Sequence, residues 1–244
     1  GLYKKYKRTY LHKFLFLFML IFCKKYICYN EFVKKDLLRF NIKSKKLVFL
    51  NNSIINPYKS PPYKDKNKKD VVFIGRLRRG SNVTLLFEAL KNLKEKHNIS
   101  LKLKIIGDGE EKANLMKIVK LNKLDMKFYG EIYDLKKITK ICKKSQFGIY
   151  PGDAGLSIVH FMSLSIVPII HKNFTRHSGP EPSYVNKKNG LFFKRQSLSS
   201  LTNLLIKISK MRPKNIYDLS KNYNQTYLCL NKVKMSDKLI QILK

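Results

Sequence analysis

From residue 71 onward, short apolar runs alternate with longer segments in which apolar residues recur every three or four positions. The short runs predict strands at 71–75, 101–107, 126–130, 147–150, 166–170 and 190–194. The longer segments predict helices at 83–96, 112–124, 135–145, 156–164 and 198–210. Because the strand runs are apolar throughout, we expect each strand to be buried on both faces. Strands that alternate with helices predict βαβ crossovers, and therefore an α/β domain with a doubly wound, Rossmann-like parallel sheet.

The first 50 residues show a shorter version of the same pattern. Apolar runs at 26–29 and 46–50 predict two strands, and Asn30 is a suitable N-cap for a helix between them. Residues 51–70 are polar, contain prolines and are dense in charge, which predicts a linker. The chain therefore divides into an N-terminal portion at 1–50, a linker at 51–70, a domain at 71–215 and C-terminal helices at 216–244.

One block, "FLFLFMLIFC" at 14–23, is apolar enough to raise the question of a membrane. A helix that spans a bilayer needs about 20 apolar residues, and this block has about half as many. The residues that follow, "KKYICYNE", contain no small-residue cleavage site of a signal peptide. The block is therefore expected to form a helix that is either buried or lies on a membrane surface, and we favour the buried helix.

The charge of the chain points toward anionic partners. Lys and Arg total 51 against 16 Asp and Glu, a formal net charge of +35. Such a balance suits nucleic acid, a phospholipid surface or a phosphorylated substrate. The alternative is a general bias toward Lys, Asn, Ile, Phe and Tyr, which would place much of the lysine on solvated faces. Four cysteines and five histidines form no cluster with the spacing of metal ligands, so no metal site is expected.

Glycines lie at the ends of the predicted strands, at positions 75, 107, 130, 152 and 155. In an open parallel sheet, ligands bind at the carboxyl ends of the strands. Glycine there lets backbone N–H groups approach an anion, and a helix that follows adds its N-terminus. A single glycine of this kind indicates only a turn, but several at one edge favour a phosphate or nucleotide site.

The order of five motifs carries a family resemblance. The segments "FIGRLRRG", "LKIIGDGE", "FYGEI", "YPGDAGLSIVHFMSLSIVPII" and "NGLFF" resemble the donor-binding C-terminal half of GT-B glycosyltransferases. The nearest match is the retaining family four type, in its O-antigen and capsule-like subgroup. Residues 21–56 are similar to the end of that family's first domain. The resemblance thus implies that 1–50 are a remnant of the acceptor domain, and that the chain is a fragment or a split enzyme with a separate N-terminal-domain chain as partner.

The resemblance also implies a site for the donor diphosphate. Arg76 follows Gly75 at the place of the family's usual arginine. The family's next basic residue falls near Ser81, where Arg78 and Arg79 supply the nearest charge. Backbone N–H groups for the diphosphate would come from the start of the helix, at Gly155, Leu156 and Ser157.

The remaining implied contacts are less regular. Where the family usually has two glutamates separated by seven residues, this chain has Gly152 and His160, as in the subgroup's "PG…GL…H" version. His160 would hydrogen-bond ribose or phosphate, or it is a helix-face histidine that is satisfied locally. Glu181 is either a contact of the donor sugar or part of a surface turn. Gly130 and Glu131 would lie beside the base.

Taken together, these implications predict a hexosyltransferase that moves a sugar from a UDP- or GDP-sugar to a hydroxyl acceptor. The resemblance implies retention of the anomeric configuration without a metal ion, because no acidic DxD pair occurs. The chemistry would fall to Arg76, Arg79, His160 and Glu181. The implied partners are a lipid-linked or saccharide acceptor of cell-surface polysaccharide or lipopolysaccharide synthesis, and an anionic membrane surface at the cytoplasmic face. The alternatives are a non-catalytic homologue that binds nucleotide sugar or a partner subunit, and a basic nucleic-acid-binding protein.

Overall fold

The larger domain is built on one parallel sheet. The computed structural model describes residues 14–15, 18–19, 21–29, 37–38, 43–58 and 70–243. Six strands form the sheet: β3 (Asp70–Ile74), β4 (Leu103–Ile106), β5 (Met126–Phe128), β6 (Ser145–Tyr150), β7 (Val167–His171) and β8 (Leu191–Phe193). Their order is β5-β4-β3-β6-β7-β8, and every pair is parallel. The predicted doubly wound sheet is confirmed, and its order reverses between β3 and β6.

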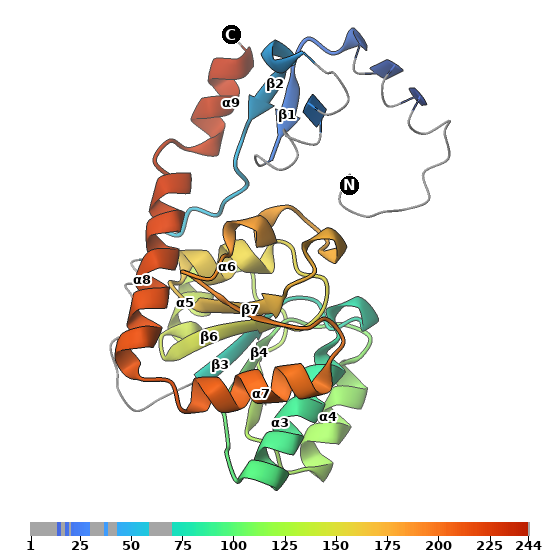
Figure 1. Ribbon diagram of the computed structural model, residues 1–244, viewed down its shortest axis with the longest axis vertical. Helices are drawn as coiled ribbons and strands as arrows, with labels where there is room; N and C mark the ends of the chain where they lie inside the picture. The colour runs from blue at the N-terminus through green and yellow to red at the C-terminus, as the bar shows by residue number, and fades with distance from the viewer. Residues whose placement is uncertain are drawn as a thin grey trace.

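Helices cover both faces of this sheet (Figure 1). One face carries α3 (Val83–His97), α4 (Lys112–Leu121) and α7 (Leu198–Ser209). The other carries α5 (Leu135–Cys142), α6 (Ser157–Ser163) and α8 (Pro213–Leu230). Short 3-10 helices lie at η2 (Arg79–Ser81), η3 (Phe174–Arg176) and η4 (Glu181–Tyr184). Each helix predicted between residues 83 and 210 is present, because its apolar stripe faces the buried sheet.

Local signals set several of these helix ends. The Asp134 side chain accepts the N–H of Lys136 at the start of α5, and Ser197 accepts the N–H of Ser200 at the start of α7. Pro213 begins α8, where its missing N–H costs no hydrogen bond. The boundary expected at 215/216 therefore falls inside α8.

The core is mostly apolar, and Lys104 is a charged exception on its central strands. The buried cluster includes Val71, Phe73 and Ile105 of the central strands. Lys104 of β4 is also buried, although the strand runs were expected to be apolar throughout. Its ammonium group lies 3.1 Å from the carboxylate of Asp70 on the neighbouring strand. A buried lysine is tolerated here because it is paired with an opposite charge.

The N-terminal portion contributes a small unit of its own. Both strands expected there are present: β1 (Tyr26–Cys28) and β2 (Leu47–Phe49) pair in parallel, and the short helix η1 (Ser44–Lys46) precedes β2. Most of the helix expected between these strands lies outside the described residues. The expectation of a buried helix at 14–23 is wrong for the described residues, because its large apolar side chains, such as Phe18 and Phe22, are exposed. No helix among the described residues has the length and apolar character needed to cross a membrane.

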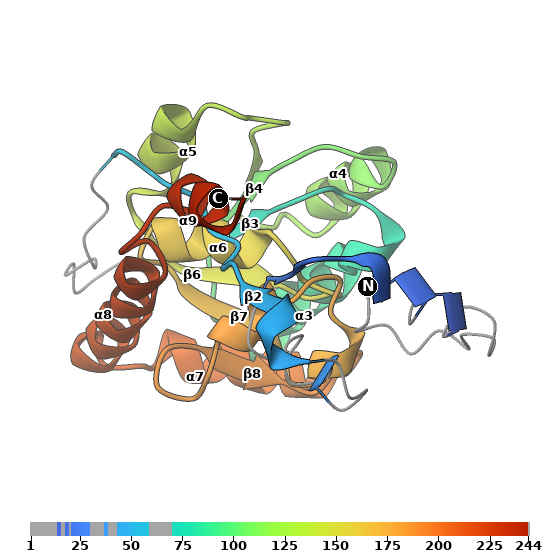
Figure 2. The ribbon, with the colours of Figure 1, turned by 90° about the horizontal axis from the view of Figure 1, so that it is seen from above.

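The start of the expected linker packs against the larger domain. The hydroxyl group of Ser53 donates to Asn231 at 2.8 Å, and the N–H of Asn56 donates to the Tyr227 hydroxyl at 3.0 Å. Residues 59–69 lie outside the described part of the chain. In Figure 1 the segment after β2 runs to the end of α8, and α9 (Met235–Leu243), seen from above in Figure 2, follows α8. The segment after β2 is therefore held beside the sheet that carries the candidate site.

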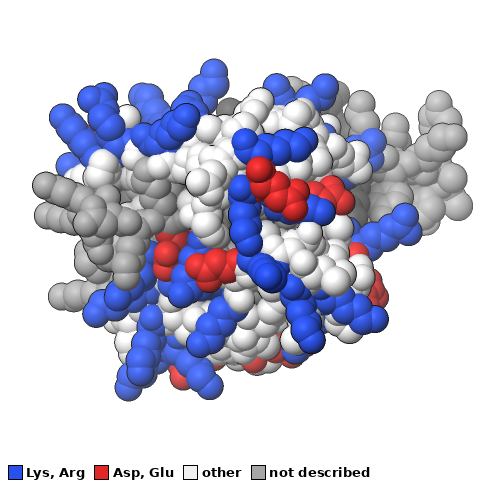
Figure 3. Space-filling view, turned by 90° about the horizontal axis from the view of Figure 1, so that it is seen from below, with Lys and Arg blue, Asp and Glu red and all other residues white. Residues whose placement is uncertain are grey.

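Basic side chains are spread over the surface. In the view from below, Lys and Arg surround most of the outline, and small groups of Asp and Glu lie between them (Figure 3). On this face the basic side chains form a run across the middle and further groups along the edge, so they are not confined to one place. A nucleic-acid-binding module would gather such residues along one face or one helix.

Candidate functional site

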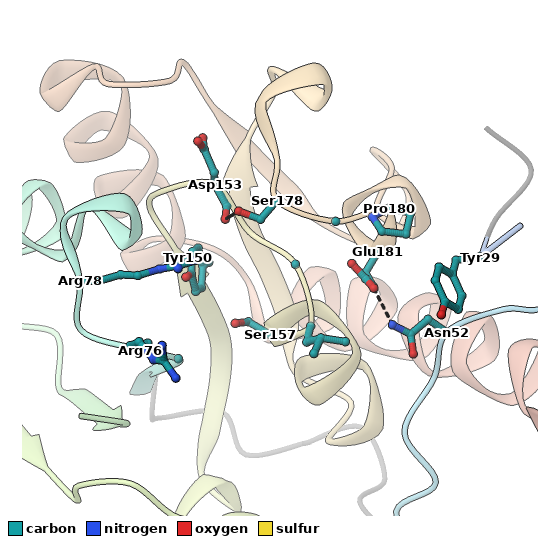
Figure 4. Close-up of a pocket in the computed structure, with 14 residues that line it drawn as sticks. Tyr29, Asn52, Arg76, Arg78, Tyr150, Asp153, Ser157, Ser178, Pro180 and Glu181 are labelled. Atoms are coloured by element: carbon teal, nitrogen blue, oxygen red, sulfur yellow. Dashed lines mark hydrogen bonds between the residues drawn. The ribbon is translucent and has the colours of Figure 1, made fainter. Parts of the chain in front are cut away.

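An open cavity of about 520 Å³ lies at the carboxyl ends of β3 and β6, where the strand order reverses (Figure 4). Its walls come from the turn after β3, the loop before α6, the segment that leads into η4, the N-terminal portion and the start of the expected linker. The lining residues are Tyr29, Asn52, Gly75, Arg76, Arg78, Tyr150, Asp153, Gly155, Leu156, Ser157, Ser178, Gly179, Pro180 and Glu181. This is the place at which an open α/β sheet binds its ligand.

One wall is basic. Arg76 and Arg78 follow β3 directly, and neither forms an ion pair with a residue that the structure describes. Gly75 has a φ of +154°, and a Cβ there would lie 2.9 Å from the ring of Tyr150. Glycine at this position therefore lets the turn pass close to Tyr150, whose ring stacks on Phe73 at 5.2 Å. Burial raises the pKa of the Tyr150 hydroxyl, which keeps it protonated at neutral pH.

Asp153 anchors the loop between β6 and α6. Its carboxylate accepts hydrogen bonds from the Arg195 side chain at 3.1 and 3.4 Å. It also lies 3.2 Å from Nε2 of His171. Burial lowers the pKa of His171, and the hydrogen bond to Asp153 opposes that shift. These contacts hold the loop in place.

A second histidine supports the same loop. His177 stacks on His171 with ring centroids 3.8 Å apart. The N–H of Ala154 donates to Nδ1 of His177 at 3.0 Å, and Nε2 of His177 donates to the carbonyl oxygen of His171 at 3.0 Å. The N–H of Ser178 in turn donates to the carbonyl oxygen of Ala154 at 2.8 Å. Burial, followed by the neighbouring His171, lowers the pKa of His177 to about 3, so the ring is neutral and its Nδ1 is able to accept.

The opposite end of the cavity holds a buried carboxylate. Glu181 is 3% exposed, and its Oε1 accepts a hydrogen bond of 2.7 Å from the amide group of Asn52. Figure 4 shows this bond as a dashed line, away from the two arginines. Oε2 is buried and has no hydrogen-bond partner among the described residues. A Cβ on Gly179 would lie 2.1 Å from Oε2, so this glycine leaves the space that the oxygen occupies.

Five residues expected in the site do not line this cavity. Arg79 begins η2, and Gly130 and Glu131 lie beyond β5, where Glu131 is exposed and accepts from the Tyr133 hydroxyl. His160 lies on α6; its Nδ1 is buried without a described partner, and burial lowers its pKa.

Gly152, the fifth of these residues, packs against backbone. A Cβ there would lie 2.1 Å from the carbonyl oxygen of Gly80 and 2.6 Å from the carbonyl carbon of Ser81. The position at which the resembled family has its first glutamate therefore has no room for a side chain while this loop stays in place.

The cavity also contains residues that the sequence did not single out. Asp153 lies inside the motif that begins at Tyr150. A charged residue between two glycines could have marked it as a functional residue. Ser178 and Gly179 precede the Pro-Glu pair, where a Ser-Gly-Pro run indicates a turn. Nothing in the local sequence marks Asn52, which meets Glu181 from 129 positions away.

Comparisons with known proteins bear on this fold. Residues 56–225 match the family model described as glycosyl transferases group 1. None of the curated protein sequences compared with the chain matches it. Similar solved structures include a glycosyltransferase from Rickettsia africae, with 16% identity and a TM-score of 0.73 over 97% of this chain and 67% of that one.

Two further solved structures are similar. A mutant of TarM from S. aureus, in complex with fondaparinux, alpha-GlcNAc-glycerol and UDP, has 16% identity and a TM-score of 0.69 over 90% of this chain and 43% of that one. Anabaena Alr3699/HepE in complex with UDP has 14% identity and a TM-score of 0.66 over 90% and 63%. The chain thus spans 43% to 67% of these proteins. At such identities the likeness shows the fold, and it confirms the expected GT-B type of α/β architecture.

Proposed function

The chain belongs to the group 1 glycosyltransferase family, and on that premise we propose that its cavity binds a nucleotide-sugar donor for transfer of the sugar to a hydroxyl acceptor. The observation that carries the proposal is the pair Arg76 and Arg78, which line the cavity at the reversal of strand order without a described acidic partner. A UDP- or GDP-sugar would bring its diphosphate to this wall. UDP is present in the TarM and HepE structures, which makes it the first nucleotide to test.

The chemical difficulty of such a transfer is the charge that develops on the leaving diphosphate. Donors that are already in place stabilise this charge most effectively, because they need not reorganise during the reaction. Guanidinium groups bind phosphate oxygens in a fork geometry. We assign the second cationic role to Arg78 instead of Arg79, since Arg78 lines the cavity. The N–H groups at Gly155, Leu156 and Ser157 would supply further donors.

Other parts of the proposal rest on the resemblance. Retention of configuration, independence of a metal ion, a ribose contact from His160 and a base contact from Gly130 and Glu131 stay predictions. So do the acceptor of cell-surface polysaccharide or lipopolysaccharide type and a place at the cytoplasmic face of the membrane. A purely binding homologue differs in one respect: it would bind the donor but release no nucleotide when acceptors are added.

Calorimetric titration with UDP and GDP tests the donor site. We expect saturable binding of one nucleotide by the wild type, and affinity weaker by about tenfold or more for Arg76→Ala, because a charge-assisted hydrogen bond is lost. Arg212→Ala is the matched control: it removes the same charge from an exposed residue outside the cavity and should bind as the wild type does. Absence of heat for both nucleotides at millimolar concentration would contradict the proposed function.

A further inference from the structure

The carboxylate of Glu181 has one oxygen that forms no hydrogen bond with the described residues. The side chain is 3% exposed, Oε1 accepts from Asn52 at 2.7 Å, and Oε2 is buried with no described partner. A carboxylate has room for about four hydrogen bonds, and a buried acceptor without one lowers the stability of the fold. Polar groups left in this condition in a native structure call for an explanation, and a ligand is one.

The position of Oε2 points to the cavity. Added Cβ atoms would lie 2.1 Å from it at Gly179 and 3.8 Å from it at Gly155, and both glycines line the cavity together with Glu181. Oε2 therefore lies beside two glycines of the cavity wall, which place no side chain around it. In Figure 4, Ser157 lies between this end and the end that holds Arg76.

The chemistry of the oxygen restricts what it binds. An ionised carboxylate only accepts hydrogen bonds, so its partner must present a hydroxyl or N–H group. A diphosphate would be repelled by Glu181 and attracted by Arg76 and Arg78. If the cavity binds a nucleotide sugar, the two ends orient it: diphosphate toward the arginines and sugar toward the carboxylate.

Resting on the proposed function, we propose that Oε2 of Glu181 accepts a hydrogen bond from a hydroxyl group of the transferred sugar. Asn52 is then a positioning residue, because its amide group engages Oε1 and leaves Oε2 directed at the ligand. The pair takes the place of a carboxylate at Gly152, where the backbone of Gly80 leaves no room for a side chain. Asn52 comes from the segment after β2, so the start of the expected linker completes the sugar end of the cavity.

The substitution Glu181→Gln replaces a hydrogen-bond acceptor, Oε2, with a hydrogen-bond donor of nearly the same size. The amide oxygen of the new side chain still accepts from Asn52, and an NH₂ group replaces Oε2 as the group that faces the sugar. We measure affinity by calorimetry for UDP, UDP-glucose, UDP-galactose, GDP and GDP-mannose. We expect the tightest nucleotide sugar to lose about tenfold or more, while its parent nucleotide binds unchanged.

A double substitution tests the role of Asn52. In N52D/E181Q, the carboxylate at position 52 accepts from the NH₂ group at position 181, and the amide oxygen at position 181 again faces the sugar. We expect this variant to bind the nucleotide sugar about threefold or more tightly than E181Q alone. A merely structural tie between the two residues predicts no such rescue.

The thermal midpoint without ligand separates binding from folding. Because E181Q replaces a buried carboxylate by a neutral amide, which costs less free energy to bury, its midpoint should equal or exceed that of the wild type. A wild type that binds neither UDP nor GDP overturns the proposed function and this inference with it. If the wild type binds a nucleotide but shows no higher affinity for the nucleotide sugar, this result overturns the present inference alone. The same holds if the nucleotide sugar is bound more tightly than its parent nucleotide and E181Q leaves that difference in affinity unchanged.

Discussion

His177 lies behind the loop that lines the cavity, and its neutral ring holds that loop in place. Nδ1 accepts from the N–H of Ala154, which a protonated ring is unable to do. Burial lowers the pKa of His177 from its ordinary value to about 3, and burial also lowers the pKa of His171. Between these values the unfolded chain binds a proton that the native protein excludes. The stability that His177 contributes is therefore present above about pH 6.5 and is lost as the pH falls toward 3.

We expect this histidine to reduce the free energy of unfolding by about 1 to 2 kcal/mol between pH 7 and pH 5. Denaturant unfolding at a series of pH values measures the effect. In His177→Asn, whose amide oxygen is also able to accept from Ala154, the fall should be smaller. His97→Asn is the control, because His97 is exposed at the end of α3. Equal pH dependence in all three proteins would contradict this explanation.

At the scale of elements, the turn after β3 and the loop after β6 fit together through glycine. The N–H of Asp153 donates to the carbonyl oxygen of Gly80 at 3.3 Å, and a Cβ at Gly152 would lie 2.1 Å from the same oxygen. The atoms in the way belong to backbone, so they are unable to move aside as a flexible side chain would. Gly152 thus allows the turn after β3, which carries Arg76 and Arg78, to lie close to the loop before α6.

Gly152→Ala should therefore lower stability by about 1 to 3 kcal/mol, the usual cost of overpacking, and should weaken UDP binding by separating Arg78 from the loop. Gly80→Ala is a matched control in the facing turn, since its Cβ would meet only the Arg78 side chain at 4.0 Å. Thermal unfolding and calorimetry of both variants measure the two effects. A Gly152→Ala protein as stable as Gly80→Ala would show that the loops separate without cost.

Periodicity predicted the elements of the sheet well, because a strand buried on both faces must be apolar along almost its whole length. Lys104 is the exception, and only the structure brings its partner Asp70 within 3.1 Å. The residues of the cavity were predicted less completely. Arg76 and Glu181 were singled out because each lies beside a motif. The glycine pattern was less informative at Gly152, because a glycine that lets a ligand come close looks the same in sequence as one that lets two loops pack together. Asn52 was missed because the fold, and no local pattern, brings it to Glu181.

For the molecule as a whole, the net charge of +35 is far larger than the binding of a single diphosphate requires. Lys and Arg lie all around the face in Figure 3, so attraction to an anionic surface needs no single patch. The described part of the 14–23 block adds exposed apolar side chains, among them Phe18 and Phe22, next to Lys24 and Lys25. Aromatic side chains flanked by lysines are suited to the interface of an anionic bilayer.

We therefore expect the protein to float with vesicles that contain phosphatidylglycerol and not with vesicles of phosphatidylcholine alone. Each basic residue near an anionic surface contributes about 1 kcal/mol, and this attraction weakens in about 1 M salt, where the screening length is about 3 Å. The variant F18S/F22S separates the apolar contribution: it should bind anionic vesicles less tightly but with the same dependence on salt. Equal flotation with both kinds of vesicle would reject the electrostatic contribution. Loss of all flotation in F18S/F22S would instead assign binding to the apolar side chains, because that variant keeps every charge of the wild type.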